Sequence, residues 1–392
     1  MKQKTILITG STGFLGSYLA REFLEMGYYL KLLVRKKAGV RVKERIPEIF
    51  PTLPGISCNT FKDRIEVIEG DVCEICLGLD GETYLRLTNT VNEVLHCAAA
   101  TKFSNTADNT LIDTNVHGTE HIFWFCLSNK PKRLHYISTA YVAGTRRGVV
   151  FEYELEKGQS FNNTYEKSKF EAERLLRQFT GKYDIPVTVY RPSIIIGDSR
   201  TDFTKSFDNI YVFAKGLYRC KNHEIRMRNR KLLNSVNYRT PLRIPGDKYS
   251  TLNLVPVDYA ARAIAAVSIQ EESINATFHI VNPSPPTLGE LAEWMRTATG
   301  IHQLKIVSLN EFRTSPYSLY EKLFLKGTES FRPYMFGEPC FDSTETGKLL
   351  RGTGIECPLI TQDILDNLIA YAVDANWGKR KISHSHHSFF SV

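Results

Sequence analysis

The sequence predicts an α/β protein in which helices cover both faces of a doubly wound parallel sheet, joined to a smaller, mainly helical C-terminal lobe. Two observations carry this prediction. Over the first 200 residues, short apolar runs alternate with amphipathic segments, as expected where buried parallel strands alternate with helices. After Gly197 the alternation loosens, residues 200 to 250 are polar and basic with weak periodicity, and short helical patterns predominate from residue 286 onward.

The expected elements follow in chain order. Buried strands are predicted at TILITG, LKLLV, IEVIEGD, EVLHCAA, RLHYIST and VTVYRPS, and helices at FLGSYLAREFLEMG, DTNVHGTEHIFWFCLSN and EKSKFEAERLLRQFTGKY. LNLVPVDYAARAIAAVSI predicts a strand end and a helix, and ATFHIVNP predicts a further strand. We therefore expect a sheet domain at residues 1–200, rejoined by about 251–285, a second lobe at 201–250 and 286–378, and a disordered tail at 379–392.

Composition places the chain among ordinary globular proteins, with 392 residues, 42% hydrophobic and 23% charged. The net charge of +8 is concentrated at residues 219–231 and in the tail, and such runs are either solvated faces or sites that attract phosphates or an acidic carrier protein. No nucleic-acid partner is expected.

The sequence contains no apolar run of about 18 residues and no signal peptide, so a cytoplasmic location and no spanning helix are expected. The eight cysteines include one close pair, CEIC, and predict no metal site.

The stretch TILITGSTGFLG leads from an apolar run into an amphipathic one through three glycines spaced three residues apart. Gly10 allows a tight turn, Gly13 allows phosphates to approach the backbone, and Gly16 lets the helix pack against the strand. The amides at a helix N-terminus carry partial positive charge that suits a pyrophosphate. The pattern indicates a Rossmann-type dinucleotide site, with an ordinary strand–helix turn as the alternative.

The end of the second predicted strand distinguishes two nucleotides. Sites for NAD commonly carry Asp or Glu there, because a carboxylate accepts a hydrogen bond from the ribose 2′-hydroxyl. Here the sequence reads VRKK, with Arg35 and Lys36 at that place and Arg45 further on. A guanidinium fork matches a 2′-phosphate, so NADP(H) is predicted, with a solvated basic turn as the alternative.

A tyrosine and a lysine stand four residues apart in NTYEKSKFEAERLL, so Tyr165 and Lys169 share one face of a predicted helix. An ammonium group beside a phenol stabilises the phenolate and is expected to lower the tyrosine pKa from about 10 toward neutrality. The strand LHYIST ends in two hydroxyls, Ser138 and Thr139, that can reach the same substrate oxygen. Together these groups predict proton exchange with a carbonyl oxygen.

These motifs resemble those of the extended short-chain dehydrogenases/reductases, and within them the branch of thioester reductases and fatty acyl-CoA reductases. The resemblance rests on LHCAAATKF, DTNVHGTEHIF, YISTAYVAG, YEKSKFEAE, YRPSIIIGDSRT and LNLVPVDYAARA, in that order. It extends from about residue 4 to 285, and more weakly to 377. The branch often has glycine where this sequence has Asp202, which affects the expected shape of the acyl entry.

The resemblance also implies roles for single residues. Thr139, Tyr165 and Lys169 would be catalytic, Ser138 would be a neighbour, and Asn115 would help to orient Lys169. Adenine would lie beside Asp71 and Val72, the diphosphate and ribose beside Ala98 and Ala99, and the nicotinamide beside Pro192 and Ser193. The full set of implied cofactor-binding residues is Gly10, Thr12, Gly13, Phe14, Leu15, Gly16, Arg35, Lys36, Asp71, Val72, Ala98, Ala99, Tyr165, Lys169, Pro192 and Ser193.

The function implied by the resemblance is NADPH-dependent reduction of an acyl thioester, carried by coenzyme A or an acyl carrier protein, to an aldehyde. Whether reduction continues to an alcohol is left open. One alternative on the same scaffold is a sugar-nucleotide epimerase or dehydratase, or a reductase of another carbonyl compound. Another is a non-catalytic protein that senses NADP. Because long acyl chains partition into bilayers, transient contact with a membrane surface is a further expectation.

Overall fold

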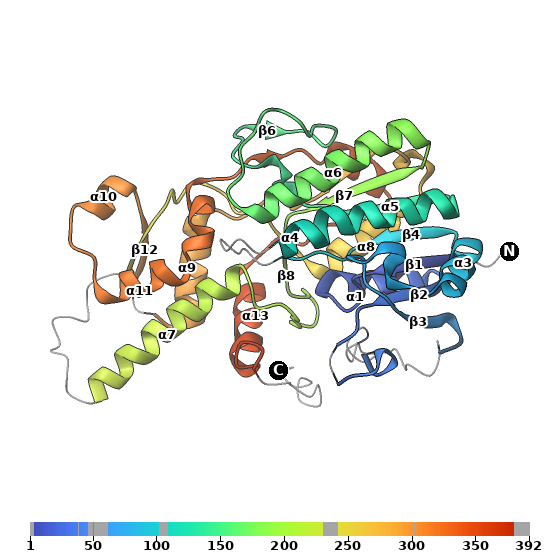
Figure 1. Ribbon diagram of the computed structural model, residues 1–392. Helices are drawn as coiled ribbons and strands as arrows, with labels where there is room; N and C mark the ends of the chain where they lie inside the picture. Colours follow the sequence, from blue (N-terminus) through green and yellow to red (C-terminus); the bar gives the residue numbers. More distant parts are fainter. Residues whose placement is uncertain are drawn as a thin grey trace. The chain divides into compact units, whose positions relative to one another are not determined.

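The computed structural model describes residues 4–37, 39–45, 50, 62–101, 109–229, 242–301 and 303–379. The predicted tail beyond Lys379, and the basic residues Arg230 and Lys231, lie outside these ranges. The chain divides into two compact units (Figure 1). The first comprises Met1–Ile195, Val257–Pro283 and Pro339–Cys357, and the second comprises Ile196–Pro256, Ser284–Glu338 and Pro358–Val392. The assignment of cofactor and substrate roles to particular domains stays a prediction.

A seven-stranded sheet of parallel strands forms the centre of the first unit and confirms the predicted fold class. The sheet order is β11-β7-β5-β4-β1-β2-β3. Its strands are β1 (Thr5–Thr9), β2 (Tyr29–Val34), β3 (Ile65–Glu69), β4 (Glu93–His96), β5 (Arg133–Ile137), β7 (Val187–Pro192) and β11 (Thr277–Ile280). The chain order reverses at β1, which lies between β2 and β4, and ligands of open α/β sheets bind outside the strand ends at such a switch point.

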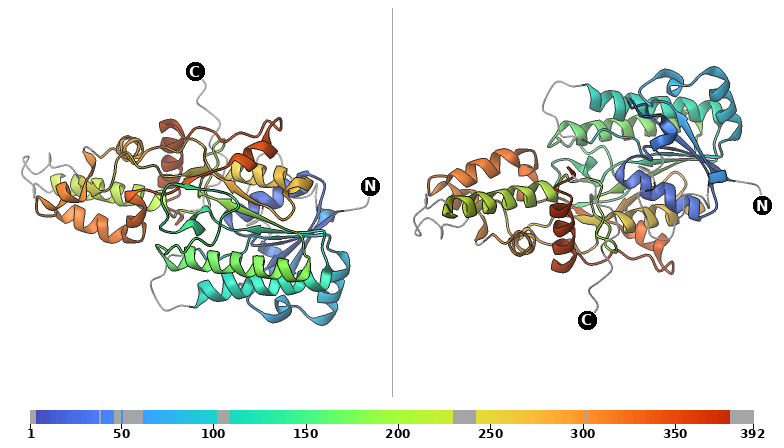
Figure 2. Two further views of the ribbon diagram at one scale, coloured as in Figure 1. Left: turned by 90° about the horizontal axis from the view of Figure 1, so that it is seen from above. Right: turned by 90° about the horizontal axis from the view of Figure 1, so that it is seen from below.

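Helices cover the sheet of the first unit on both faces, with α1 and α8 on one and α5 and α6 on the other (Figure 2). The helices of this unit are α1 (Phe14–Glu25), α3 (Gly81–Thr90), α4 (Thr110–Ile112), α5 (Gly118–Asn129), α6 (Thr164–Tyr183), α8 (Val257–Ser268) and α12 (Thr344–Leu350). Its shorter elements are η1 (Val42–Arg45), η2 (Lys62–Arg64), η3 (Ile75–Gly78), a π-helical turn η4 (Asp113–His117), η5 (Ala140–Ala143), η7 (Glu271–Ser273), and the parallel pair β6 (Val149–Val150) and β13 (Cys340–Phe341).

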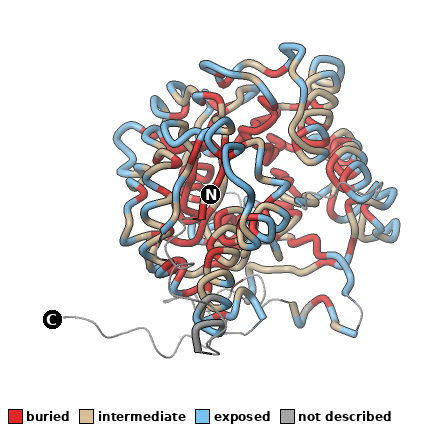
Figure 3. The backbone as a smooth tube through the Cα atoms, turned by 90° about the vertical axis from the view of Figure 1, so that its left-hand side faces the viewer, coloured by how far each residue is buried: buried red, intermediate tan, exposed pale blue. Residues whose placement is uncertain are grey.

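Burial explains why the strand sequences are continuously apolar. Ile6, Leu7 and Ile8 follow one another in β1 and none of them is exposed, because helices pack against both faces of the sheet. In Figure 3 the buried segments gather in the interior and the exposed segments lie on the outside. Complete burial of one such side chain contributes about 1.5–3 kcal/mol.

The second unit is mainly helical. It contains α7 (Ile210–Asn229), α9 (Leu288–Thr299), α10 (Leu309–Arg313), α11 (Leu319–Gly327), η8 (Glu329–Phe336) and α13 (Gln362–Asp374), with β9 (Leu242–Pro245) parallel to β12 (Leu304–Val307). The short strands β8 (Ile194–Ile196) and β10 (Leu254–Pro256) fall at the unit boundaries. Helix α7 occupies the polar segment in which the sequence pattern predicts no element, because its abundant charged residues obscure the apolar stripe of Ile210, Ala214 and Leu217.

Candidate active site

The glycine turn between β1 and α1 is as tight as the sequence predicts. Gly10 has a positive φ of 73° and its carbonyl accepts a hydrogen bond of 2.8 Å from the Gly13 amide. A Cβ atom at Gly16 would lie 2.1 Å from the Gly10 oxygen, and one at Gly10 would lie 2.5 Å from the Ala98 nitrogen. Helix α1 begins after Gly13 without a side-chain cap and without an acidic residue in its first turn. The turn therefore presents backbone amides and positive partial charge to an anion.

Two buried hydroxyls support the interpretation of this turn as part of a dinucleotide site. Within the described parts of the chain, the side-chain oxygens of Ser11 and Ser193 are buried and have no hydrogen-bond partner. Ser11 belongs to the glycine turn, and Ser193 follows β7, where the resemblance places the nicotinamide. Buried hydroxyls normally have hydrogen-bond partners, so both oxygens fit a bound ligand whose polar groups reach the glycine turn and the end of β7. The residues present thus suit a nicotinamide dinucleotide.

The predicted adenine end lies beyond β2 and β3. Arg35 and Lys36 follow β2 and are exposed, and the Arg45 guanidinium donates a hydrogen bond of 2.6 Å to the backbone carbonyl oxygen of Arg35. Asp71 follows β3, and its amide donates to the Leu77 carbonyl at 2.9 Å while its carboxylate accepts from the Cys73 amide at 3.0 Å. The structure places these residues at the carboxyl ends of neighbouring strands.

The three predicted catalytic residues gather at the ends of β5 and α6. Thr139 follows β5, and its hydroxyl donates to the Pro192 carbonyl at 3.4 Å and also makes a hydrogen bond with Tyr165. Tyr165 lies in the first turn of α6, and Lys169 lies one turn later. The Lys169 ammonium is buried, with 2% of the residue exposed, and donates to the Ile137 carbonyl at 2.7 Å.

The pKa of Tyr165 shifts in the direction opposite to the sequence prediction. Burial raises it, the nearby Cys97 thiol acts in the same direction, and the hydrogen bond with Thr139 opposes them only partly. The prediction fails because burial of the phenol has the largest effect on its pKa, while the Lys169 ammonium donates to the Ile137 carbonyl and lies over the Tyr136 ring. Burial lowers the pKa of Lys169 to about 8, so near pH 7 the phenol is protonated and most of the lysine is charged.

Asn115 connects α6 to the segment after β4, and none of its hydrogen bonds to described residues is with Lys169. Its side-chain nitrogen donates to the Ser168 hydroxyl at 2.8 Å and to the Ala100 carbonyl at 3.0 Å, and its side-chain oxygen accepts from the Ala100 amide at 2.8 Å. Asn115 belongs to the π-helical turn η4, a local widening often found at functional sites. The implied orienting role of Asn115 stays a prediction.

His96, which no motif of the sequence singles out, links the glycine turn to Asn115. The Thr9 hydroxyl accepts a hydrogen bond from the Ala98 amide and forms a second one, of 2.8 Å, with His96 Nδ1. On the other side, Thr119 donates to the Asn115 carbonyl, so it accepts from His96 Nε2 at 3.2 Å. Burial lowers the pKa of His96 to about 3, so its ring is neutral at pH 7, and with the proton on Nε2 the Nδ1 atom accepts from the Thr9 hydroxyl.

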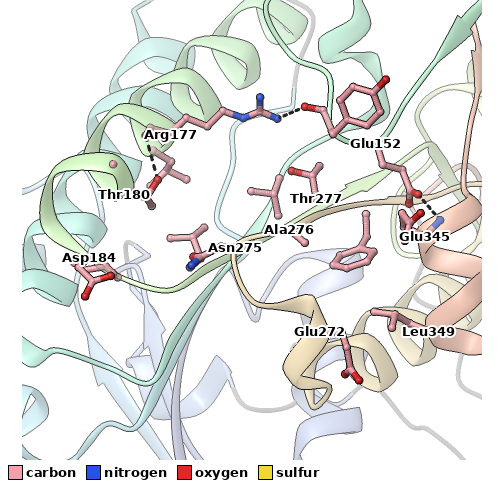
Figure 4. A pocket seen from close by; sticks show the side chains of 17 residues that line it. Glu152, Arg177, Thr180, Asp184, Glu272, Asn275, Ala276, Thr277, Glu345 and Leu349 are labelled. Carbon is pink, nitrogen blue, oxygen red and sulfur yellow. Dashed lines mark hydrogen bonds between the residues drawn. The ribbon is translucent and has the colours of Figure 1, made fainter.

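A separate cavity of about 690 Å³ lies in the first unit, beside the N-terminal ends of β7 and β11 (Figure 4). Its lining contains none of the predicted site residues. Two of its charged side chains bind other lining residues: Arg177 donates to the Tyr153 carbonyl, and the Glu152 carboxylate accepts from the Glu345 amide. The cavity and the predicted active site are therefore different places.

The part of the chain that the structure describes contains no grouped set of metal-binding side chains and no helix that could span a membrane. In the described ranges, no three His, Cys, Asp or Glu side chains are grouped to hold a metal ion. Among the described helices, none has both the length and the apolar character needed to cross a bilayer.

Comparison with known proteins adds a family and several relatives. The model of the NAD_binding_4 family, described as male sterility protein, matches residues 8–264. The chain is 25% identical over 390 residues to a linear gramicidin synthase of Brevibacillus parabrevis, a match that covers 93% of this chain and 7% of the relative. It is 28% identical over 311 residues to a carboxylic acid reductase of Mycobacterium marinum, a match that covers 74% of this chain and 26% of the relative. The chain thus spans well under a third of these relatives' length.

Among solved structures, the terminal R domain from the myxalamid PKS-NRPS biosynthetic pathway is similar to this chain with a TM-score of 0.79. The two are 26% identical, and the match covers 96% of this chain and 92% of the R domain. The likeness therefore extends over both units and not only over the parallel sheet.

Proposed function

We propose a function for this chain, which belongs to the male sterility protein family (NAD_binding_4): it reduces an acyl thioester to an aldehyde, with NADPH as the hydride donor. The family and the Rossmann-type sheet indicate an oxidoreductase with a nicotinamide cofactor. The observation that carries the proposed reaction is the buried cluster of Thr139, Tyr165 and Lys169, which can hold and protonate a carbonyl oxygen.

The residues that would hold the cofactor are those of the glycine turn, together with the Ser11 and Ser193 hydroxyls. Bound there, NADPH supplies the hydride for the thioester carbonyl. The Thr139 and Tyr165 hydroxyls donate hydrogen bonds to the oxygen as negative charge develops on it. Because the pKa of Tyr165 is raised, its phenol is protonated at neutral pH and can act as the acid in the reducing direction.

The chemical balance of the reaction is simple. The carbonyl carbon gains a hydride and the oxygen gains the Tyr165 proton, which gives a hemithioacetal. The carbon–sulfur bond then breaks, the thiol leaves with a proton, and an aldehyde remains. The phenolate left on Tyr165 is stabilised by the positive charge of Lys169 one helical turn away, and solvent returns the proton.

The preference for NADPH rests on Arg35 and Arg45. Replacement of Arg35 by Ala removes a charge-assisted contact with the 2′-phosphate, so KM for NADPH is expected to rise about 10- to 100-fold while KM for NADH changes little. Steady-state kinetics with both nucleotides measures this. Lys37→Ala, a neighbouring exposed basic residue, serves as the control. Equal effects of Arg35→Ala on the two nucleotides would contradict the NADPH assignment.

A carrier protein is the proposed thioester donor, and the exposed face of α7 is its proposed docking surface. Arg219 and Arg226 lie seven residues apart on one face of α7 and are exposed. His223 Nδ1 and the Tyr320 hydroxyl form a hydrogen bond of 3.1 Å, which ties α7 to α11. On α11, Leu319 and Leu323 are 62% and 57% exposed. Basic and apolar groups together suit an acidic protein surface that also buries apolar side chains.

Charge reversal tests this docking surface. Arg219→Glu with Arg226→Glu is expected to raise KM for a carrier-bound thioester about tenfold or more while leaving kcat, and KM for the corresponding coenzyme A thioester, nearly unchanged. Lys305→Glu, at an exposed position of β12, is the matched control. An unchanged KM for the carrier-bound substrate would remove α7 as the docking surface.

The reaction itself is tested by following NADPH oxidation with acyl-CoA thioesters of graded chain length and with one acyl-carrier-protein thioester, with NADH in parallel. Products are trapped as aldehyde or alcohol. We expect NADPH turnover, release of free thiol, and an aldehyde as the first product. Cofactor binding without turnover on any thioester would overturn the proposed function and favour a sugar-nucleotide or other carbonyl substrate.

A further inference from the structure

The aromatic ring of Tyr136 lies beside the Lys169 ammonium and carries the further inference. The Lys169 nitrogen lies 4.3 Å from the centroid of the Tyr136 ring. Tyr136 belongs to β5, immediately before Ile137, whose carbonyl accepts the lysine hydrogen bond, and its side chain is fully buried. One strand thus provides both the carbonyl and the ring against which the ammonium lies.

We propose that Tyr136 is a positioning residue for the reduction: its ring face holds the Lys169 ammonium in place and in its charged form. The negative face of an aromatic ring attracts a cation within about 6 Å, and the attraction is strongest where water is excluded. The inference rests on the proposed function, because it assigns Tyr136 a role in the step that Lys169 supports.

The surroundings of Lys169 show why a ring matters there. The ionisable groups around it are Tyr165 and Glu173 on α6, His96 and Cys97 at the end of β4, and Tyr136 on β5. Of these, only Glu173 is negatively charged at neutral pH, and its carboxylate accepts hydrogen bonds from Arg191 and Ser138. Burial raises the pKa of Cys97 to about 12 and lowers that of His96 to about 3, so both are neutral.

Among the residues that the structure describes, Lys169 therefore has no carboxylate dedicated to it. In a buried site a cation without compensation loses its proton, and burial already lowers the pKa of Lys169 to about 8. The Ile137 carbonyl takes one of the three N–H groups. The ring face is the second stabilising contact, and it leaves the remaining donor capacity for the phenolate of Tyr165.

The proposed role of Tyr136 depends on its ring and not on its hydroxyl. The Tyr136 hydroxyl is buried near the Thr119 hydroxyl, but among the described residues no well-formed hydrogen bond joins the two. The neighbouring Thr119 hydroxyl gives its proton to the Asn115 carbonyl at 2.6 Å and accepts from His96. A phenylalanine would therefore keep everything that the proposal requires, and this makes Tyr136→Phe the matched control.

The experiment compares the dependence of kcat on pH in four kinds of variant. Tyr136→Leu removes the ring, so the alkaline limb of the profile is expected to move down by about one pH unit. Tyr136→Phe keeps the limb where it is. Phenylalanines at position 136 with increasing ring fluorination keep the shape but weaken the ring face, and they are expected to move the limb downward in steps. Phe125→Leu removes another ring of the same buried cluster and is expected to leave the limb in place.

A second readout does not depend on substrate. NMR titration of isotope-labelled lysine, with the Lys169 signal identified by its absence in Lys169→Met, is expected to show the same downward shift of about one unit in Tyr136→Leu and graded shifts in the fluorinated series. If thioesters are not reduced at all, the proposed function fails, while this titration still decides the ring contact. Identical Lys169 titrations in the parent and fluorinated proteins would overturn the inference, and if Tyr136→Leu does not fold the fluorinated series decides alone.

Discussion

Two buried cations in the first unit, Arg191 and Lys169, are held in very different ways. Arg191 is 0% exposed, and its Nε and one terminal nitrogen donate to the Glu173 carboxylate while the other terminal nitrogen donates to the Glu152 carbonyl at 3.2 Å. Lys169 is almost as buried, yet it has one backbone carbonyl and one aromatic ring. We call the two groups the Arg191 cluster (Arg191, Glu173, Glu152, His279, Ser138) and the Lys169 cluster (Lys169, Tyr165, Thr139).

The difference shows how one protein interior uses buried charge for two purposes. In the Arg191 cluster every strong donor meets an acceptor, and the Glu152 carboxylate also accepts from the His279 amide of the edge strand β11 and from the first turn of α12. Such saturation fixes structure and leaves nothing for a substrate. The Lys169 cluster is less saturated, which costs stability but keeps its donors available for chemistry.

The largest expected effect tests the Lys169 cluster. Tyr165→Phe removes the proposed acid and one oxyanion donor while keeping the ring, so kcat is expected to fall by about 10²- to 10⁴-fold. The melting temperature and the dissociation constant of NADPH, measured by thermal denaturation and fluorescence titration, are expected to stay close to the parent values. Full turnover in this variant would show that the proton comes from another group and would contradict the catalytic role proposed for the Lys169 cluster.

The next largest effect belongs to the Arg191 cluster. Glu173→Gln leaves Arg191 buried with an uncompensated charge, so the free energy of unfolding is expected to fall by about 3–5 kcal/mol. Chemical denaturation measures this loss. In the protein that remains folded, kcat is expected to change far less than in Tyr165→Phe. A large loss of kcat in Glu173→Gln without a loss of stability would mean that the Arg191 cluster takes part in the reaction and is not only structural.

A third prediction concerns pH and two of the buried histidines, His96 beside the Lys169 cluster and His279 in the Arg191 cluster. Burial lowers the pKa of His96 and of His279 to about 3, and for His279 the charge of Arg191 adds to the effect. Between about pH 6.5 and 3 the unfolded chain therefore binds more protons than the folded one, so stability is lost as pH falls through this window. The expected loss is about 1.4 kcal/mol per pH unit for each histidine.

Denaturation at a series of pH values checks this slope. His279→Gln removes one of the two titrating groups, and its stability is expected to fall less steeply below pH 6.5 than that of the parent protein. Equal slopes in the two proteins would show that His279 is not kept neutral by the fold.

Sequence spacing predicted the parts of this molecule that depend on near neighbours in the chain. The glycines of the first turn stand three apart, and Tyr165 and Lys169 stand four apart on α6, so the strand–turn–helix and the shared helix face could both be predicted. The parallel sheet followed from apolar runs of strand length, and the structure confirms it. The catalytic and cofactor roles of these residues stay predictions.

The Arg191 cluster could not be predicted in the same way. Glu173 and Arg191 lie 18 residues apart, and Glu152 and His279 lie 127 apart, so no local pattern pairs them. Tyr136 resembles any aromatic residue of a buried strand until the fold brings Lys169 over its ring. The pKa of Tyr165 was predicted in the wrong direction for a related reason: helical spacing shows which face a lysine shares but not how deeply the phenol is buried.

The smallest expected effect distinguishes the neighbouring hydroxyls of Ser138 and Thr139, whose importance for kcat could not be ranked from the sequence pattern alone. The Ser138 hydroxyl donates to Glu173 at 2.8 Å and so belongs to the Arg191 cluster, whereas the Thr139 hydroxyl bonds with Tyr165 and belongs to the Lys169 cluster. Ser138→Ala is therefore expected to cost about 1 kcal/mol of stability and to leave kcat within about twofold of the parent value. Thr139→Val, matched in shape, is expected to lower kcat about 10²- to 10³-fold with little change in melting temperature. If Ser138→Ala instead lowered kcat as strongly as Thr139→Val, the boundary between the two clusters would not run between these adjacent residues.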